Sequence, residues 1–145
     1  MKIRVCIPSY KRPEVATFKY LDCPYVYVDN KEYEEYVDAN PGHEDHIVAV
    51  PDGVQGNLCR IRNYIMQTEF ENGYDVVCII DDDMEGMYIW EVSGCKSVKR
   101  KINEDEFLTI LEKYSILRGS PPSSSITSGF TTLESSITKS LSKII

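Results

Sequence analysis

The sequence lacks the features that mark several classes of protein. No apolar run approaches the ~20 residues of a membrane-spanning helix, and the opening MKIRVCIPSYKRP is too polar for a signal peptide. We therefore expect a cytoplasmic protein with no membrane partner. The five cysteines are odd in number and at least 17 positions apart, which indicates neither a zinc knuckle nor a disulfide framework.

Positive charge is also scarce. The chain has 16 Lys and Arg against 23 Asp and Glu, and the formal charge of −7 argues against a broad basic surface for nucleic acid. One local exception is the cluster of Lys96, Lys99, Arg100 and Lys101. Such a cluster is typical of a solvated loop or hairpin, and a local basic patch remains as the alternative.

The composition predicts one globular domain followed by a tail. With 145 residues, of which 42% are hydrophobic and 27% charged, the chain can bury one core. We place the domain at residues 1–119. From Ser120 the composition changes, because 13 of the last 26 residues are Ser or Thr. The plain prediction for residues 120–145 is a flexible tail, and a weakly docked helix is the alternative.

Short β-branched runs alternate with helical segments along the domain. Pro, Gly and Asp punctuate the runs, and Asn103 and Glu106 form a capping-box pattern at the last helix. We predict strands at residues 3–7, 25–29, 47–50 and 76–80, an extra strand or hairpin from residue 87, and helices at 32–39, 57–72 and about 103–117. This alternation predicts an α/β fold with a mostly parallel sheet and helices on both faces.

The helix predicted at residues 57–72 carries an apolar stripe. At 100° per residue, Leu58, Ile61 and Ile65 fall on one face, and Arg62 falls among them. A charge buried in this stripe needs a partner, and a carboxylate at a neighbouring strand end could supply it. Glu69 also falls in the stripe, which we interpret as an exposed end of the helix.

The segment VVCIIDDDM, residues 76–84, joins an apolar strand directly to three carboxylates. In open parallel sheets ligands bind beyond the carboxyl ends of the strands. Adjacent carboxylates repel one another, and a divalent cation relieves the repulsion; the hard oxygens suit Mn²⁺ or Mg²⁺. Alternation would direct Asp81 and Asp83 to one side and Asp82 elsewhere. The alternative is a solvated acidic turn.

Four motifs in this order carry a resemblance. They are I-P-S-Y-K-R-P at residues 7–13, V-D at 28–29, G-N-L-C-R-I-R-N-Y at 56–64 and D-D-D at 81–83. Over about residues 1–90 the chain resembles the nucleotide-sugar-binding half of GT-A (Rossmann-like) glycosyltransferases, whose DxD or xDD motif presents acids to a divalent metal, the ribose and the diphosphate. More narrowly, the order resembles the TET-associated glycosyltransferases of phages, to which modification of hydroxymethylated bases in DNA is attributed.

The resemblance implies a site for a nucleotide-sugar donor, with a UDP-sugar as the first choice and a modified base in DNA as the acceptor. It implies that the wall around base and ribose consists of Pro8, Ser9, Tyr10 and Arg12. Asp29 would accept a hydrogen bond from the base, and Arg62 would contact the diphosphate. Asp81 and Asp82 would lie near the ribose, and Asp83 would be a ligand for Mn²⁺ or Mg²⁺. It assigns no catalytic base.

The function predicted from these residues is therefore metal-dependent glycosyl transfer. Because GT-A domains are usually longer than this chain, a truncated domain that binds a nucleotide sugar without transferring it is one alternative. A phosphoryl-transfer domain and a non-catalytic interaction module are the others.

Several residues also have a purely structural interpretation. Pro8 can simply end a strand, Asp29 can form a turn, and Arg62 can make an ion pair. Tyr88 and Trp90 share one face of a predicted strand, where core packing is the default and stacking of an acceptor the alternative. His43 and His46 have the spacing of a metal pair, but the preceding Pro41-Gly42 argues against the helix that such a pair needs.

Overall fold

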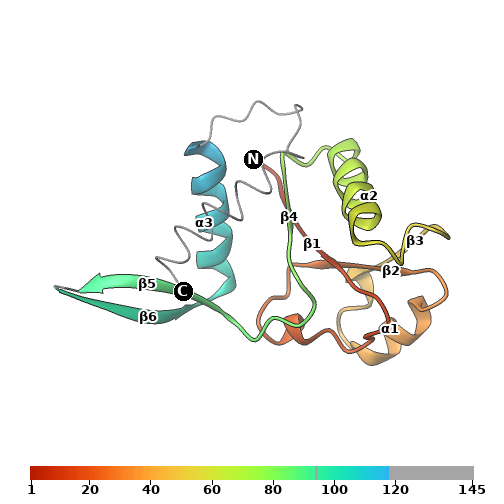
Figure 1. Ribbon diagram of the computed structural model, residues 1–145, viewed down its shortest axis with the longest axis horizontal. Helices are drawn as coiled ribbons and strands as arrows, with labels where there is room; N and C mark the ends of the chain where they lie inside the picture. The colour runs from red at the N-terminus through yellow and green to blue at the C-terminus, as the bar shows by residue number, and fades with distance from the viewer. Residues whose placement is uncertain (94, 118–145) are drawn as a thin grey trace. The chain divides into compact units, whose positions relative to one another are not determined.

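The computed structural model describes residues 1–93 and 95–117 (Figure 1). The chain divides into two compact units, Met1–Glu85 and a second that begins at Gly86. Each unit is described by itself below. The predicted Ser/Thr-rich tail, residues 120–145, lies outside the described residues.

The first unit is built on a parallel sheet of four strands (Figure 1). All pairings are parallel, in the order β3-β2-β1-β4. The strands are β1 (Ile3–Pro8), β2 (Tyr25–Asp29), β3 (Ile47–Val50) and β4 (Val76–Ile79). They lie where the β-branched runs predicted them, with ends that differ by at most one residue. The α/β class and the parallel sheet are confirmed, and the strand order is compatible with a Rossmann-like core.

This strand order fixes where a ligand can approach. The chain steps outward from β1 to β2 and β3, and then returns to place β4 on the other side of β1. In the register of the β1–β4 pair, Ile3 lies opposite Val76 and Cys6 opposite Ile79. The loops that follow β1 and β4 therefore leave the same edge of the sheet side by side. In doubly wound folds this reversal of strand order marks the binding crevice.

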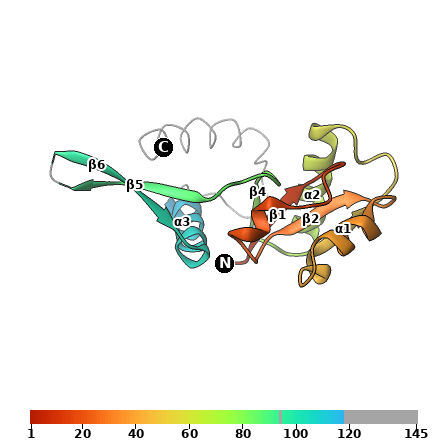
Figure 2. The ribbon, with the colours of Figure 1, turned by 90° about the horizontal axis from the view of Figure 1, so that it is seen from below.

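Four helical segments connect the strands (Figures 1 and 2). They are η1 (Ala16–Lys19), α1 (Tyr33–Ala39), η2 (Glu44–His46) and α2 (Leu58–Glu71). At the start of α2, the Asn57 side chain accepts a hydrogen bond of 3.0 Å from the backbone N–H of Arg60. At its end, Gly73 has φ 84°, a left-handed conformation that glycine adopts without strain. The start and stop predicted for this helix are confirmed.

Two hydrophobic clusters hold the first unit together. One contains Ile61 and Ile65 of α2 together with Cys6 of β1. The other contains Tyr36 of α1 together with Ile7 of β1. Cys6 and Ile7 are neighbours in the sequence, and they belong to different clusters because successive side chains of a strand point to opposite faces.

Two expectations for α2 were wrong. Leu58, predicted in the apolar stripe, is 57% exposed, because it lies at the first turn of the helix, outside the packed cluster. Glu69, predicted at an exposed end, is buried. Its carboxylate lies 2.9 Å from Arg4 Nε and accepts a hydrogen bond of 2.5 Å from the Tyr27 hydroxyl. These two partners on β1 and β2 make burial of the charge possible.

Removing the Glu69 carboxylate would leave the Arg4 guanidinium and the Tyr27 hydroxyl without their shared partner. We expect Glu69→Ala to lower the free energy of unfolding by about 3 kcal/mol. Glu71→Ala, an exposed position two residues further along α2, is the matched control and should change it by less than about 0.5 kcal/mol. Urea unfolding followed by circular dichroism measures both. Equal effects would show that the buried contacts of Glu69 do not stabilise the unit.

The stability of the first unit should also fall at alkaline pH. Burial, followed by the charge of Glu69, raises the pKa of the Cys6 thiol from 9.0 to about 12. Between these values the unfolded chain ionises Cys6 and the folded chain does not, so the stabilisation present below pH 9 is lost as the pH rises. Burial raises the pKa of Tyr27 and Tyr36 as well, so these two hydroxyls also make the folded state less stable as the pH rises.

We therefore expect the urea midpoint to drop as the pH rises from 9.0 to about 12. Cys6→Ala should reduce this drop, whereas Cys59→Ala, which removes an exposed thiol of α2, should leave it unchanged. A drop of the same size in wild type and Cys6→Ala would contradict the assignment to Cys6.

The second unit contains a β-hairpin and a helix (Figures 1 and 2). Strands β5 (Met87–Ser93) and β6 (Lys96–Ile102) pair antiparallel, as the hairpin alternative predicted. Helix α3 (Glu104–Leu117) follows. Asn103 Oδ1 accepts a hydrogen bond from the Glu106 N–H, and the Glu106 carboxylate accepts one from the Asn103 N–H, which confirms the capping box. Within the described residues no helix is long and apolar enough to cross a membrane.

Candidate functional site

The three carboxylates after β4 have different environments. Asp82 is buried, with 3% of its side chain exposed, whereas Asp81 and Asp83 are 73% and 66% exposed. The alternation in the sequence predicted that Asp82 would point away from its neighbours, and the exposures agree. The triplet therefore offers two carboxylates to solvent and one to the protein.

Asp82 connects the loop after β4 to the loop after β1. Its Oδ2 accepts a hydrogen bond of 2.5 Å from Ser9 Oγ, which lies 2.8 Å from the Tyr36 hydroxyl. The Tyr36 hydroxyl in turn accepts a hydrogen bond from the backbone N–H of Arg12. Asp82 Oδ1 finds no hydrogen-bond partner among the described residues and lies 2.8 Å from Arg12 Nη2, as an ion pair. A network of hydrogen bonds and an ion pair thus connects the loops after β1 and β4 at this edge of the sheet.

Thr17 of η1 fixes the backbone of the acidic turn. The Thr17 N–H donates to the Asp82 carbonyl at 3.2 Å, and its hydroxyl donates to the Asp81 carbonyl at 2.8 Å. The same hydroxyl accepts a hydrogen bond from the Met84 N–H. Because the backbone of the turn is held on both sides of Asp82, the directions of Asp81 and Asp83 are set by buried contacts. The sequence carried no signal for this role of Thr17.

Arg12 is shared between two carboxylates. Its Nη1 lies 3.1 Å from Asp83 Oδ2, in addition to the contact between Nη2 and Asp82. The charge of Asp82, followed by the hydrogen bond to Asp83, raises the pKa of Arg12 above its ordinary value. The guanidinium is largely exposed, so its contact with Asp83 can rearrange when an anion approaches.

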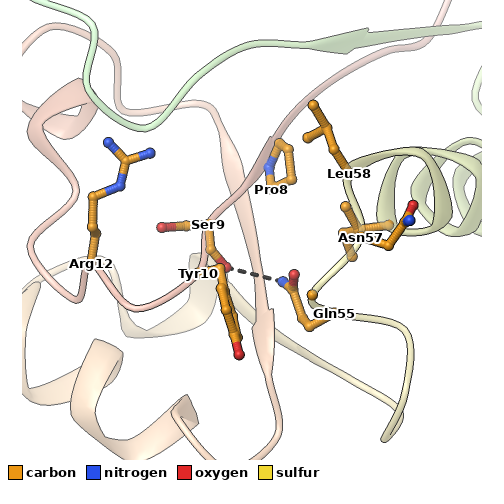
Figure 3. Close-up of a pocket in the computed structure, with 9 residues that line it drawn as sticks. Pro8, Ser9, Tyr10, Arg12, Gln55, Asn57 and Leu58 are labelled. Carbon is orange, nitrogen blue, oxygen red and sulfur yellow. Dashed lines mark hydrogen bonds between the residues drawn. The ribbon is translucent and has the colours of Figure 1, made fainter.

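A pocket of about 270 Å³ lies between the loop after β1 and the start of α2 (Figure 3). Its volume is close to the lower end for small-molecule sites, so it can enclose part of a ligand. Four residues that the sequence predicted for donor binding line it, together with five that it did not predict. These are Pro8, Ser9, Tyr10 and Arg12, and then Gln55, Gly56, Asn57, Leu58 and Ile61.

Gln55 is the clearest residue that sequence reasoning missed. It is almost fully buried, and its Nε2 donates to the Ser9 carbonyl at 3.0 Å (Figure 3). The same Nε2 donates to the Tyr27 carbonyl at 2.9 Å. Both amide protons are used within the protein, so what remains for a ligand is the acceptor Oε1. A glutamine in a loop gives no signal of this kind, because its partners are known only once the sheet is assembled.

The pocket also lies at the N-terminus of α2, where backbone N–H groups lack partners inside the helix. The Asn57 side chain satisfies the N–H of Arg60, while the preceding amides, of Leu58 and Cys59, have no acceptor within the helix itself. The positive end of the helix dipole and the Arg12 guanidinium are the cationic features of this pocket. Together they suit a phosphate group better than a neutral ligand.

Four of the eight predicted donor-site residues do not line the pocket, and these are Asp29, Arg62, Asp81 and Asp82. The Asp29 carboxylate accepts a hydrogen bond of 2.9 Å from the Lys31 N–H, the arrangement of a turn former. Arg62 Nη2 lies 4.0 Å from Asp81 Oδ1, at the outer limit of an ion pair. Arg62 is 36% exposed, so it is not the fully buried charge that the helical stripe predicted, although its Nε finds no hydrogen-bond partner among the described residues.

The histidine pair makes structural contacts. His43 Nε2 lies 3.2 Å from Asp22 Oδ1, and its ring stacks on Phe18. His46 Nδ1 lies 2.9 Å from the Pro24 carbonyl oxygen. In the part of the chain that the structure describes, no three or more His, Cys, Asp or Glu side chains gather into a group that could hold a metal ion.

Asp82 and Asp83 should differ in their effect on stability, because only Asp82 is buried. Asp82→Ala removes the acceptor of the Ser9 hydroxyl and the ion pair of Arg12, and should lower the free energy of unfolding by about 2 kcal/mol. Asp83→Ala, an exposed neighbour, should change it by less than about 0.5 kcal/mol. Urea unfolding of the two variants makes the comparison. Equal stabilities would contradict a structural role for Asp82.

The comparisons with known proteins add no relative of this chain. No protein-family model matches it, and neither a curated protein nor a solved structure does. What can be inferred about function therefore depends on the residues around the acidic turn and the pocket.

Proposed function

We propose that the first unit binds a nucleotide sugar in the manner of a GT-A glycosyltransferase and transfers the sugar with the help of a divalent cation. One observation carries the proposal. The acidic turn after β4 is tied through Asp82 to the loop after β1, at the point where the strand order reverses and beside a pocket. In α/β sheets this is the place where nucleotides bind.

The packing of helices against the sheet supports the GT-A part of this proposal. Residues that alternate along β1 and β2 divide between two clusters, one with α2 and one with α1. This division is what a sheet covered by helices on both faces produces. The resemblance to the GT-A donor half implies that arrangement, with an acidic motif at the end of a strand.

The lining of the pocket suggests how a donor would lie. Tyr10 is 42% exposed and offers an aromatic face to a base, while Pro8 and Ser9 form the adjoining wall. Gln55 Oε1 supplies an acceptor, for which an N–H of the base or a ribose hydroxyl is the matching donor. The diphosphate would lie against Arg12 and the N-terminus of α2.

Asp81 and Asp83 fit the role of ligands for Mn²⁺ or Mg²⁺. Both carboxylates are exposed, and they belong to a backbone segment that Thr17 holds in place. Two carboxylates supply only some of the six oxygens that such a cation needs, so phosphate oxygens of the donor and water would supply the others. The resemblance implied that Asp82 contacts the ribose. In this proposal Asp82 instead positions Ser9 and Arg12.

The reaction breaks the bond between the anomeric carbon and the diphosphate oxygen and forms a bond from that carbon to the acceptor's hydroxyl oxygen. The hydroxyl proton is released, and the nucleoside diphosphate is the leaving group. The negative charge that develops on this oxygen is what Arg12 can stabilise, since its guanidinium lies at the acidic turn, 2.8 Å from Asp82 and 3.1 Å from Asp83. A bound cation would supply Lewis-acid neutralisation of the leaving diphosphate. The Ser9–Asp82 contact would keep Arg12 in place throughout.

Isothermal titration calorimetry tests the proposal, after a thermal-shift screen of nucleotide sugars with and without Mn²⁺ has selected the donor. UDP-glucose is the first candidate. We expect binding that requires Mn²⁺ and is weakened about tenfold or more in Asp83→Ala, because one of the proposed ligands is lost. Asp38→Ala, which removes an exposed carboxylate from α1, is the matched control and should bind like wild type.

Three results would contradict the proposal or narrow it. No stabilisation by any nucleotide sugar would reject donor binding. Equal binding by Asp83→Ala and Asp38→Ala would reject the metal site. Metal-dependent binding without release of nucleoside diphosphate, measured in a coupled assay with water as acceptor, would favour a binding domain without transfer.

A further inference from the structure

The second unit presents a surface that the proposed donor site does not use. In the β5–β6 hairpin, Tyr88 lies opposite Lys101, Trp90 opposite Lys99, and Val92 opposite Ser97. Residues that lie opposite each other in an antiparallel pair share a face, and alternate residues share the same one. These six residues therefore form one face of the hairpin, called here the basic hairpin face.

The basic hairpin face exposes an aromatic ring next to ammonium groups. Tyr88 is 38% exposed, Trp90 is partly exposed, and Lys99 and Lys101 are exposed. The Nζ of Lys99 lies 4.2 Å from the centre of the Tyr88 ring, within the range of a cation–π contact. Val92, near the tip of the hairpin, is 80% exposed.

The opposite face of the hairpin has a different character. Met87 and Ile102 are buried there. Arg100, on the same face, makes ion pairs of 2.8 Å with both Glu91 and Glu106. The two carboxylates thus neutralise the cation of this face within the unit. The six positions of the basic hairpin face carry no Asp or Glu.

The charge of the hairpin is opposite to that of the chain. Residues 86–102 contain four Lys and Arg and one acidic residue, Glu91, in a protein whose formal charge is −7. A local cationic surface on an anionic protein attracts anions selectively at that surface. The charge complementarity points to a polyanion as the occupant.

We propose that the basic hairpin face binds a single strand of nucleic acid, with an unpaired base stacked on Tyr88 and phosphates beside Lys99 and Lys101. Aromatic faces interleaved with cations are the features that bind single strands without sequence preference. Tyr88 is the stacking platform, because Trp90 is only partly exposed and its Nε1 is buried. Bases paired within a duplex cannot reach the ring faces in this way.

The inference does not depend on donor binding by the first unit. It uses only contacts inside the hairpin, and it can be tested with no nucleotide sugar present. Failure of the donor-binding experiments would leave it unaffected, and its own failure would leave the donor site unaffected.

Fluorescence anisotropy of a labelled oligothymidine about 12 nucleotides long, titrated with the full chain, measures the binding. We expect affinity that falls steeply between about 50 and 200 mM salt. A duplex of the same length and a polyglutamate of similar charge should both bind at least about tenfold more weakly than the single strand, because neither offers unpaired bases.

Two pairs of variants locate the surface. Tyr88→Ala should weaken binding about tenfold, whereas Tyr114→Ala, which removes a ring of similar exposure from α3, should not. Lys99→Glu should weaken binding and lower the salt slope by about one or more, whereas Lys113→Glu, with the same change in net charge, should leave both unchanged. Circular dichroism confirms that each variant is folded; if Tyr88→Ala is not, the lysine pair decides.

Several outcomes would overturn the inference. One is the absence of binding at the lowest salt concentration. Equal affinity for duplex or polyglutamate would show charge attraction without stacking, or a protein partner in place of nucleic acid. Equal losses in Lys99→Glu and Lys113→Glu would show that the whole charge of the chain, rather than this face, determines the affinity.

Discussion

The buried carboxylate of Asp82 is the interaction on which the candidate site depends. It accepts a hydrogen bond from the Ser9 hydroxyl and pairs with Arg12, so it joins the segments that follow β1 and β4. A buried charge is stable only when its partners are in place, and the loops on both sides are therefore held in one arrangement. The sheet brings these loops side by side, and Asp82 determines how they face each other.

Because Asp82 is held in this way, the three adjacent acids have different roles. Asp82 serves the protein, while Asp81 and Asp83 point into solvent from a backbone that Thr17 holds. A cation site needs carboxylates that are exposed and also positioned, and an isolated acidic loop satisfies only the first requirement. The same network holds Arg12, which also lines the pocket, and Gln55 anchors another part of the lining to the sheet.

Local patterns in the sequence predicted much of this structure. The strands, the caps of α2 and α3, the hairpin and the opposite directions of Asp81 and Asp82 all follow from residues within a few positions of each other. Contacts between residues far apart in the sequence could not be predicted from such patterns. Glu69 is buried because Arg4, 65 positions away, supplies its cation, and Gln55 matters because it meets the carbonyl of Ser9, 46 positions away. Patterns with periods of two or 3.6 residues contain no information about such pairs.

The most direct test of the central claim is paramagnetic broadening of backbone amide signals by Mn²⁺ in the nuclear magnetic resonance spectrum. With a nucleotide sugar present, the account predicts broadening concentrated at residues 9–12 and 81–84, and much weaker broadening when Mn²⁺ is added alone. Broadening spread over other exposed acids, such as Glu34 and Glu35 of α1, and independent of the nucleotide, would contradict it.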